Sequence, residues 1–438
     1  MKRHAISPRP AADAARRAEG GGGWQGTHAQ QPGAAPLRPT DVIGAFFLAG
    51  VLFIVAGAVV AVADAIDPWR WGRWLALHLI FIGGLSQLIL GASQFFAGAF
   101  LATDPPPRGL IRAQFVTWNV GAIYLAAAVP WGVEAFVATG AALLVVSLAL
   151  YVAGFAAMRR RALNTAPWAS RWYVTGAAFL AVGVVAGVTL ANGYRWQHGD
   201  LLGAHMALNL GGWLGVAIVG TLHTFYPSLT RTQLQLPRLQ APTFAAWCGG
   251  VAALALGYGL AVDRLAVAGW IMLCVAAALL FANVGAAVAA ARVPLALPAR
   301  LVGAAQFFLL AGALVAAAAA VGSGPAHALA GPTRAAVAAL LLAGWIGLTV
   351  AGSMLHLLAL LNRVRDPIRG LPDDHRLRDG AIAAAAVAAI ALLALAHLLE
   401  LDTLIEVAVI AVACVYAGLG GRLATLAGRA ALNARPRI

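Results

Sequence analysis

The stretch "AHMALNLGGWLGVAIVGTLHTF" at residues 204–225 combines the features that decide the fold. It has no acidic or basic residue other than histidine, and it is long enough for the ~20 residues that a helix needs to cross a bilayer. His205 and His223 lie near its two ends, roughly 27 Å apart along a helix that rises about 1.5 Å per residue. The stretch therefore predicts a membrane-spanning helix whose two histidines belong to two different sites.

The composition of the whole chain agrees with this prediction. Of the 438 residues, 61% are hydrophobic and 11% are charged, and the mean hydropathy is +0.82. A soluble domain cannot bury so much apolar surface, so we expect a polytopic helical membrane protein in contact with the lipid bilayer. The net charge of +14 lies in short basic stretches between apolar segments, such as "RRR" at 159–161. That distribution is typical of cytoplasmic loops and argues against binding of nucleic acid.

Twelve segments are apolar and long enough to span a membrane. They lie at 41–66, 74–103, 111–132, 134–158, 171–193, 201–227, 241–262, 265–291, 298–322, 330–361, 380–399 and 403–428. We expect an all-α bundle of twelve transmembrane helices over residues 41–428. Residues 1–40 are polar and rich in proline and glycine, which predicts a disordered cytoplasmic tail. Residues 429–438 are expected to form a cytoplasmic C-terminal tail.

A glycine pattern recurs in every fourth predicted helix. Helix 2 reads "GGLSQLILGAS" from Gly83, helix 6 reads "GWLGVAIVGTLH" from Gly212, and helix 10 reads "GWIGLTVAGSMLH" from Gly344. In each of them a second glycine follows eight residues later. Such a face permits the close approach of another helix or of a flat ligand. The spacing predicts three repeated units of four helices each.

The histidines fall into two sets by their predicted depth. His78 and His205 lie about one turn into helices 2 and 6 from the outer surface, and His327 opens helix 10 on the same side. His223 and His356 lie at the inner ends of helices 6 and 10, where a metal site is one possibility and an interfacial role is the other. Ionisable residues inside a membrane are costly, so each of them is a candidate functional residue.

The outer pair has the features of a haem site. Two imidazoles from facing helices can supply both axial ligands of a haem iron. Gly83 and Gly84, and likewise Gly212, follow the histidines and would leave room for a flat ring, while Asn209 could orient His205 or a haem substituent. The alternative is that each histidine is neutral and hydrogen-bonded inside the bundle. The sequence identifies no catalytic residue.

The pattern resembles the main subunit of haem-copper oxidases and nitric oxide reductases. "LHLIFIGGLSQLILGASQFFAGAF" and "AHMALNLGGWLGVAIVGTLHTFYPSLTRTQ" look like small bacterial membrane proteins that are often labelled copper oxidase or oxidase-subunit-I-like. The resemblance implies a b-type haem, with copper also possible, in a bacterial inner membrane. In the oxidases the low-spin haem joins helices 2 and 10, so the resemblance leaves His327 as the alternative to His205 as the partner of His78. It also implies oxidoreductase chemistry and a cupredoxin or cytochrome as electron donor.

The chain departs from this family at two places. Helix 7, "TFAAWCGGVAALALGYGL", has none of the histidines that complete the family's copper site, and no Asp, Glu or Lys lies deep in a predicted span. We therefore expect electron transfer, or handling or sensing of a small gas, without a complete copper–haem centre. The alternatives are a twelve-helix transporter of a small solute or metal, and a protein that handles copper or haem in the nitric oxide response.

The distribution of basic residues predicts that both termini are cytoplasmic. Of the 30 Lys and Arg residues, only Arg70, Arg73, Arg195, Arg264 and Arg334 fall in the predicted outer segments. A fluorescent protein fused after Ile438 should therefore fluoresce, and alkaline phosphatase fused at the same place should be inactive. The opposite result for the two fusions would contradict this topology.

Overall fold

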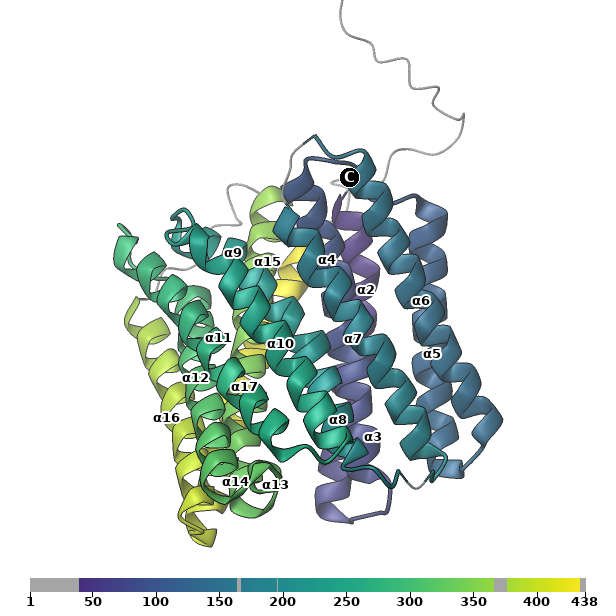
Figure 1. Cartoon of the computed structure of the whole chain (residues 1–438). Helices are drawn as coiled ribbons and strands as arrows, with labels where there is room; N and C mark the ends of the chain where they lie inside the picture. Colours follow the sequence, from purple (N-terminus) through teal and green to yellow (C-terminus); the bar gives the residue numbers. More distant parts are fainter. Residues whose placement is uncertain (1–38, 164–166, 195, 366–375, 434–438) are drawn as a thin grey trace, which may run out of the picture. The chain divides into compact units, whose positions relative to one another are not determined.

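The computed structural model describes residues 39–163, 167–194, 196–365 and 376–433. These residues belong to one compact unit that covers Arg38–Ile438, and the predicted tail at 1–40 lies almost entirely outside the described residues. Every regular element in the described ranges is a helix (Figure 1). The described chain therefore confirms the all-α class.

The first eight predicted spans lie in the first two thirds of the chain. Six of them are single helices, and two are composite, which means that each consists of three consecutive helical segments. The elements are α2 (Pro39–Ile66), α3 (Gly72–His78) with η1 (Leu79–Leu85) and α4 (Ser86–Leu101), α5 (Arg108–Trp131), α6 (Glu134–Arg160), α7 (Pro167–Ala191), α8 (Leu201–Met206) with η2 (Ala207–Gly215) and α9 (Val216–Thr230), α10 (Gln240–Gly259) after the short η3 (Pro237–Leu239), and α11 (Asp263–Ala290).

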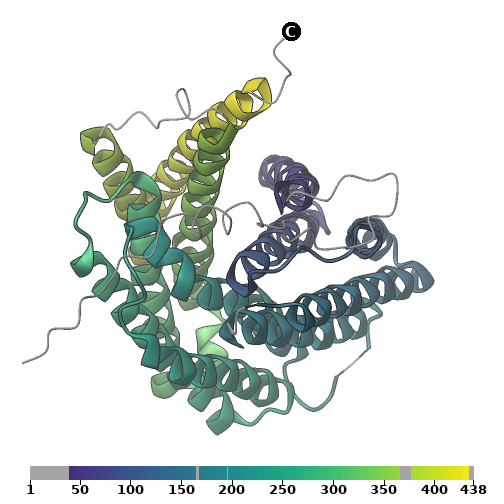
Figure 2. The same cartoon turned by 90° about the horizontal axis from the view of Figure 1, so that it is seen from above.

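The last third of the chain follows the same plan with one composite span. Its elements are α12 (Leu297–Ser323), the short α13 (Pro325–Ala328), α14 (Gly331–Ala338) with η4 (Ala339–Gly347) and α15 (Leu348–Arg365), α16 (Arg376–Leu398) and α17 (Asp402–Asn433). Helix α17 thus continues past the predicted end of the transmembrane domain at 428. Seen from above, the pairs α5 and α6, α10 and α11, and α16 and α17 lie side by side (Figure 2).

Eleven helices of the described ranges are long and apolar enough to cross a membrane. The one remaining predicted span is the third, α5, which has 24 residues and carries the polar residues Arg112, Gln114 and Asn119. Its length still matches a bilayer, and its polar side chains lower its hydropathy. The multi-pass membrane bundle is therefore confirmed by the described helices.

The second, sixth and tenth spans each contain a π-helical segment, in which the turn is wider than in an α-helix. These segments are η1, η2 and η4. In each segment one carbonyl at the matching position accepts a hydrogen bond from an aromatic side chain of another helix. The bonds run from Trp118 Nε1 to the Ile82 carbonyl over 3.1 Å, from Trp247 Nε1 to the Gly211 carbonyl over 3.0 Å, and from the Tyr416 hydroxyl to the Ala343 carbonyl. π segments are rare and recur at functional sites.

The repeated glycines receive side chains from the first helix of each predicted unit. A Cβ atom added at any of them would lie within 3.0 Å of a large side chain. The pairs are Gly83 with Phe53, Gly212 with Phe179, Gly344 with Phe308, and Gly220 with Trp172. Of the two uses expected for the glycine faces, the structure shows the approach of another helix. The room for a flat ring beside Gly83 and Gly212 is filled by phenylalanine, and Gly84 meets Ile54.

These contacts recur at matching positions in the three predicted four-helix units. The π segment, the aromatic donor to its carbonyl and the phenylalanine on its glycine are common to all three. The third donor, Tyr416, comes from the twelfth span rather than the eleventh. The correspondence supports three related units, and the repeat itself stays a prediction.

Substitution of Gly220 by alanine should destabilise the protein, because its Cβ would collide with the indole of Trp172. Overpacking of this kind costs about 1–3 kcal/mol, which thermal unfolding in detergent should show as a lower midpoint. Gly285→Ala is the matched control, since nothing lies within 4 Å of its Cβ position. Equal midpoints for the two variants would show that the close contact at Gly220 does not stabilise the fold.

Candidate functional site

His78 is the last residue of α3 and is held by Trp74, one turn earlier. Its Nδ1 lies 2.7 Å from the Trp74 carbonyl oxygen, and its ring stacks on the Trp74 indole with centroids 4.1 Å apart and planes at 24°. A carbonyl can only accept a hydrogen bond, so Nδ1 carries the proton. The Nε2 atom therefore keeps its lone pair, which can coordinate a metal ion.

His205 lies in α8, whose first turn is capped by Asp200 through a 2.9 Å bond from the Gly203 N–H. The His205 Nδ1 lies 2.9 Å from the Gly183 carbonyl oxygen on α7. Asn209 Nδ2 donates to the His205 carbonyl over 2.6 Å and lies 3.1 Å from Nδ1. Because the Gly183 carbonyl can only accept, we assign the Nδ1 proton to that bond, which leaves Nε2 of His205 unprotonated as well.

Two glycines of α7 make room for this arrangement. A Cβ at Gly183 would lie 2.7 Å from Asn209 Nδ2, and a Cβ at Gly187 would lie 2.9 Å from Cε1 of His205. The role expected for Asn209, orienting His205, is consistent with these contacts. Sequence analysis did not identify Gly183, Gly187 or Trp74. The spacing of Trp74 and His78, four residues apart on one helix face, was the available signal for the last of them.

The structure brings His78 and His205 together. Their ring centroids lie 6.5 Å apart and their planes meet at 24°. Eight residues further along each helix, Trp213 Nε1 donates to Ser86 Oγ over 2.8 Å. At about 1.5 Å per residue this second link lies roughly 12 Å deeper in the bundle. The sixth span therefore contacts the second at two levels. The histidine pair lies near the start of the two spans, and the bond between Trp213 and Ser86 lies further along them.

The chemistry of the pair follows from its protonation. Two imidazoles that both carry their proton on Nδ1 have no hydrogen to share between their Nε2 atoms, and each Nε2 can accept a hydrogen bond from water or bind a metal ion. Two metal–nitrogen bonds of about 2.0–2.1 Å placed in line separate two imidazole centroids by roughly 6.5 Å. The observed spacing is compatible with one metal centre between the rings.

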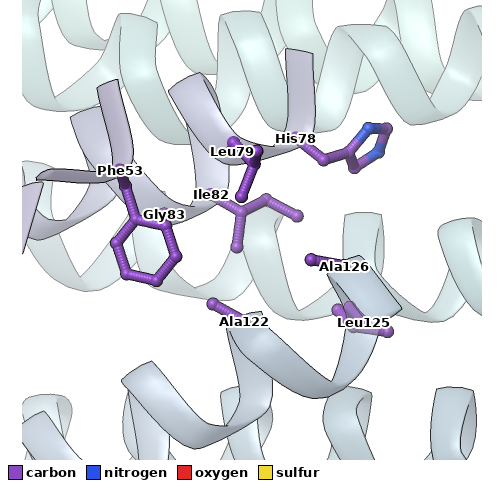
Figure 3. A pocket seen from close by; sticks show the side chains of 8 residues that line it. All are labelled: Phe53, His78, Leu79, Ile82, Gly83, Ala122, Leu125 and Ala126. Carbon is purple, nitrogen blue, oxygen red and sulfur yellow. The ribbon is translucent and has the colours of Figure 1, made fainter. Parts of the chain in front are cut away.

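A small cavity lies beside His78 (Figure 3). It has room for about one water-sized molecule. Its other walls are apolar and come from α2, η1 and α5, namely Phe53, Leu79, Ile82, Gly83, Ala122, Leu125 and Ala126. This cavity is too small for a macrocycle, so a haem would require the surrounding side chains to move.

The remaining histidines lie elsewhere. His327 is exposed on the separate short helix α13, so it precedes the tenth span rather than opening it. His223 is 1% exposed, donates from Nδ1 to the Val219 carbonyl over 2.8 Å and stacks on Trp172 with centroids 5.8 Å apart. The His356 ring contacts Phe225 edge-on at 5.6 Å. The ring contacts found in the described ranges do not join His223 to His356, and a metal site between them stays a prediction.

Comparisons with protein families and with curated proteins identify no relative. No protein-family model matches the chain, and no curated protein matches it. Within the described ranges no group of three or more His, Cys, Asp or Glu side chains is placed to hold a metal ion. The candidate site therefore rests on a pair of histidines and on their hydrogen bonds.

The positions of the histidines can be checked by chemical modification of the folded protein. Diethyl pyrocarbonate attacks an accessible unprotonated ring nitrogen, so exposed His198 and His327 should react quickly and buried His223 should react only after unfolding. Peptide mass spectrometry measures the extent at each position. Rapid modification of His223 in the folded protein would contradict its burial.

Proposed function

We propose that this multi-pass membrane protein binds haem through Nε2 of His78 and Nε2 of His205 and passes electrons through it. The observation that carries the proposal is the facing pair of imidazoles at 6.5 Å, both with Nδ1 bound to a backbone carbonyl. Hydrogen bonds of this kind fix the orientation of metal-binding histidines and make them stronger ligands. Bound haem would supply one-electron chemistry.

With His78 and His205 both bound to the iron, no site on the iron would remain for a gas, so this pair of residues favours electron transfer over binding of a gas. The carbonyls of Trp74 and Gly183 keep both Nε2 atoms unprotonated. Phe53, Leu79, Ile82 and Leu125 give His78 an apolar surrounding on the side of the small cavity. A location in a bacterial inner membrane, and a cupredoxin or cytochrome as electron donor, are part of the proposal through the resemblance to oxidase-subunit-I-like proteins.

A single copper ion at the same pair is the second candidate. One observation favours it. The glycine faces at Gly83 and Gly212, which a macrocycle would need, are covered by phenylalanine. Imidazole is a good ligand for copper, and a bare ion needs no space for a macrocycle.

The decisive experiment combines an optical spectrum of the purified protein with metal analysis. Protein from cells with ample haem and copper should show the sharp bands of a six-coordinate low-spin haem, at about one haem per chain. Copper at about one ion per chain without haem would select the second candidate. His78→Ala and His205→Ala should each abolish the bound group.

His327→Ala is the matched control, because His327 is exposed on α13. It should retain the spectrum and the metal content of the wild type. Loss of the haem signal in His78→Ala and His327→Ala, but not in His205→Ala, would replace the pairing proposed here with one between the second and tenth spans. A protein with neither haem nor copper would refute the proposed function.

A further inference from the structure

We infer that Trp74 is a positioning residue, whose indole fixes the ring plane of His78 for whatever the histidine pair binds. The inference rests on the proposed function, which supplies the ligand of the histidine pair. The positioning of His78 is argued from the geometry of the two rings. The indole covers one face of the imidazole at a centroid distance of 4.1 Å with an angle of 24° between the planes. Contact between aromatic faces at this distance restricts rotation of the smaller ring.

Trp74 is itself held in place from several helices. Trp71 meets its ring edge-on, with centroids 6.0 Å apart and planes at 81°. Trp74 also packs, together with Leu125 of α5 and Val188 of α7, against a buried cluster that consists of Ala128, Val129 and Val137. Because the indole packs against side chains of α5 and α6, it can transmit a fixed orientation to His78.

The indole and the backbone of Trp74 act on different properties of His78. The carbonyl binds the Nδ1 proton and so determines which nitrogen is free, but one hydrogen bond leaves the ring able to pivot about it. The indole opposes that pivot. His205 is held differently, by the hydrogen bond from its Nδ1 to the Gly183 carbonyl and by the close approach of Gly187 to its Cε1. The two ligands therefore depend on different residues.

This division allows the side chain to be tested alone, since any residue at position 74 keeps the backbone carbonyl. Trp74→Leu removes the aromatic face, and Trp74→Phe keeps a smaller one. Trp131→Leu is the matched control, because Trp131 is 80% exposed at the end of α5. Circular dichroism and the unfolding midpoint verify that each variant folds.

The first measurement uses haem-free protein with ¹⁵N-labelled histidine, in which His78→Asn assigns the His78 signals. In Trp74→Leu the ring signals of His78 should shift and broaden, while those of His205 stay in place. Trp74→Phe should restore a narrow signal, and Trp131→Leu should match the wild type. Unchanged His78 signals in Trp74→Leu would overturn the positioning role, whether or not the wild type binds haem.

The second measurement titrates the same proteins with haemin and with Cu(I). Loss of a residue that orients a metal-binding side chain lowers metal affinity by about 10- to 100-fold. Trp74→Leu should therefore bind haemin or Cu(I), whichever the wild type binds, with an affinity lower by that factor. Trp74→Phe should recover part of the loss. Affinity equal to that of the wild type in Trp74→Leu would overturn the inference. Absence of binding by the wild type itself contradicts the proposed function and leaves the ring signals to decide the role of Trp74.

Discussion

The close approach of helices at glycine is the constraint on which the rest of the structure depends. In lipid, helices gain little by burying apolar surface from one another, so association relies on packing at small residues. Here each of the three composite spans has a glycine that contacts a phenylalanine of the preceding span. A Cβ atom on that glycine would not fit. This contact sets the separation of the helices, and the separation in turn decides whether side chains such as His78 and His205 can meet.

A second constraint is that the membrane interior offers no water to satisfy polar groups. The carbonyls of Ile82 and Gly211 in the π segments bind indole N–H groups of α5 and α10, and the histidines bind carbonyls through Nδ1. The same requirement that stabilises the bundle therefore determines the chemistry of the site. Each imidazole donates the hydrogen on Nδ1 to a backbone oxygen, which leaves its Nε2 atom unprotonated.

The helices could be predicted well from the sequence, because twelve apolar segments separated by basic or proline-rich stretches have few other solutions in a membrane. The matching positions of His78 and His205 along the second and sixth spans could also be found by counting residues, and the two rings do come together. The π segments could not be predicted, since they depend on contacts between distant helices such as that of Trp247 with Gly211. For the same reason the filling of the glycine faces by Phe53 and Phe179 required the structure. The pattern of small residues is the same for a helix and for a flat ligand.

The composite spans also show how the placement of the histidines and the packing can vary separately. His78 lies five residues before Gly83, and His205 lies seven residues before Gly212; the intervening η1 and η2 have seven and nine residues. A wide turn accommodates an inserted residue without breaking the helix on either side, whereas one residue in a regular helix rotates everything beyond it by about 100°. An insertion or deletion within such a turn would therefore re-aim a histidine while the glycine contact below kept its register. A π segment is therefore a place at which evolution can change the direction of a histidine side chain without loss of the bundle.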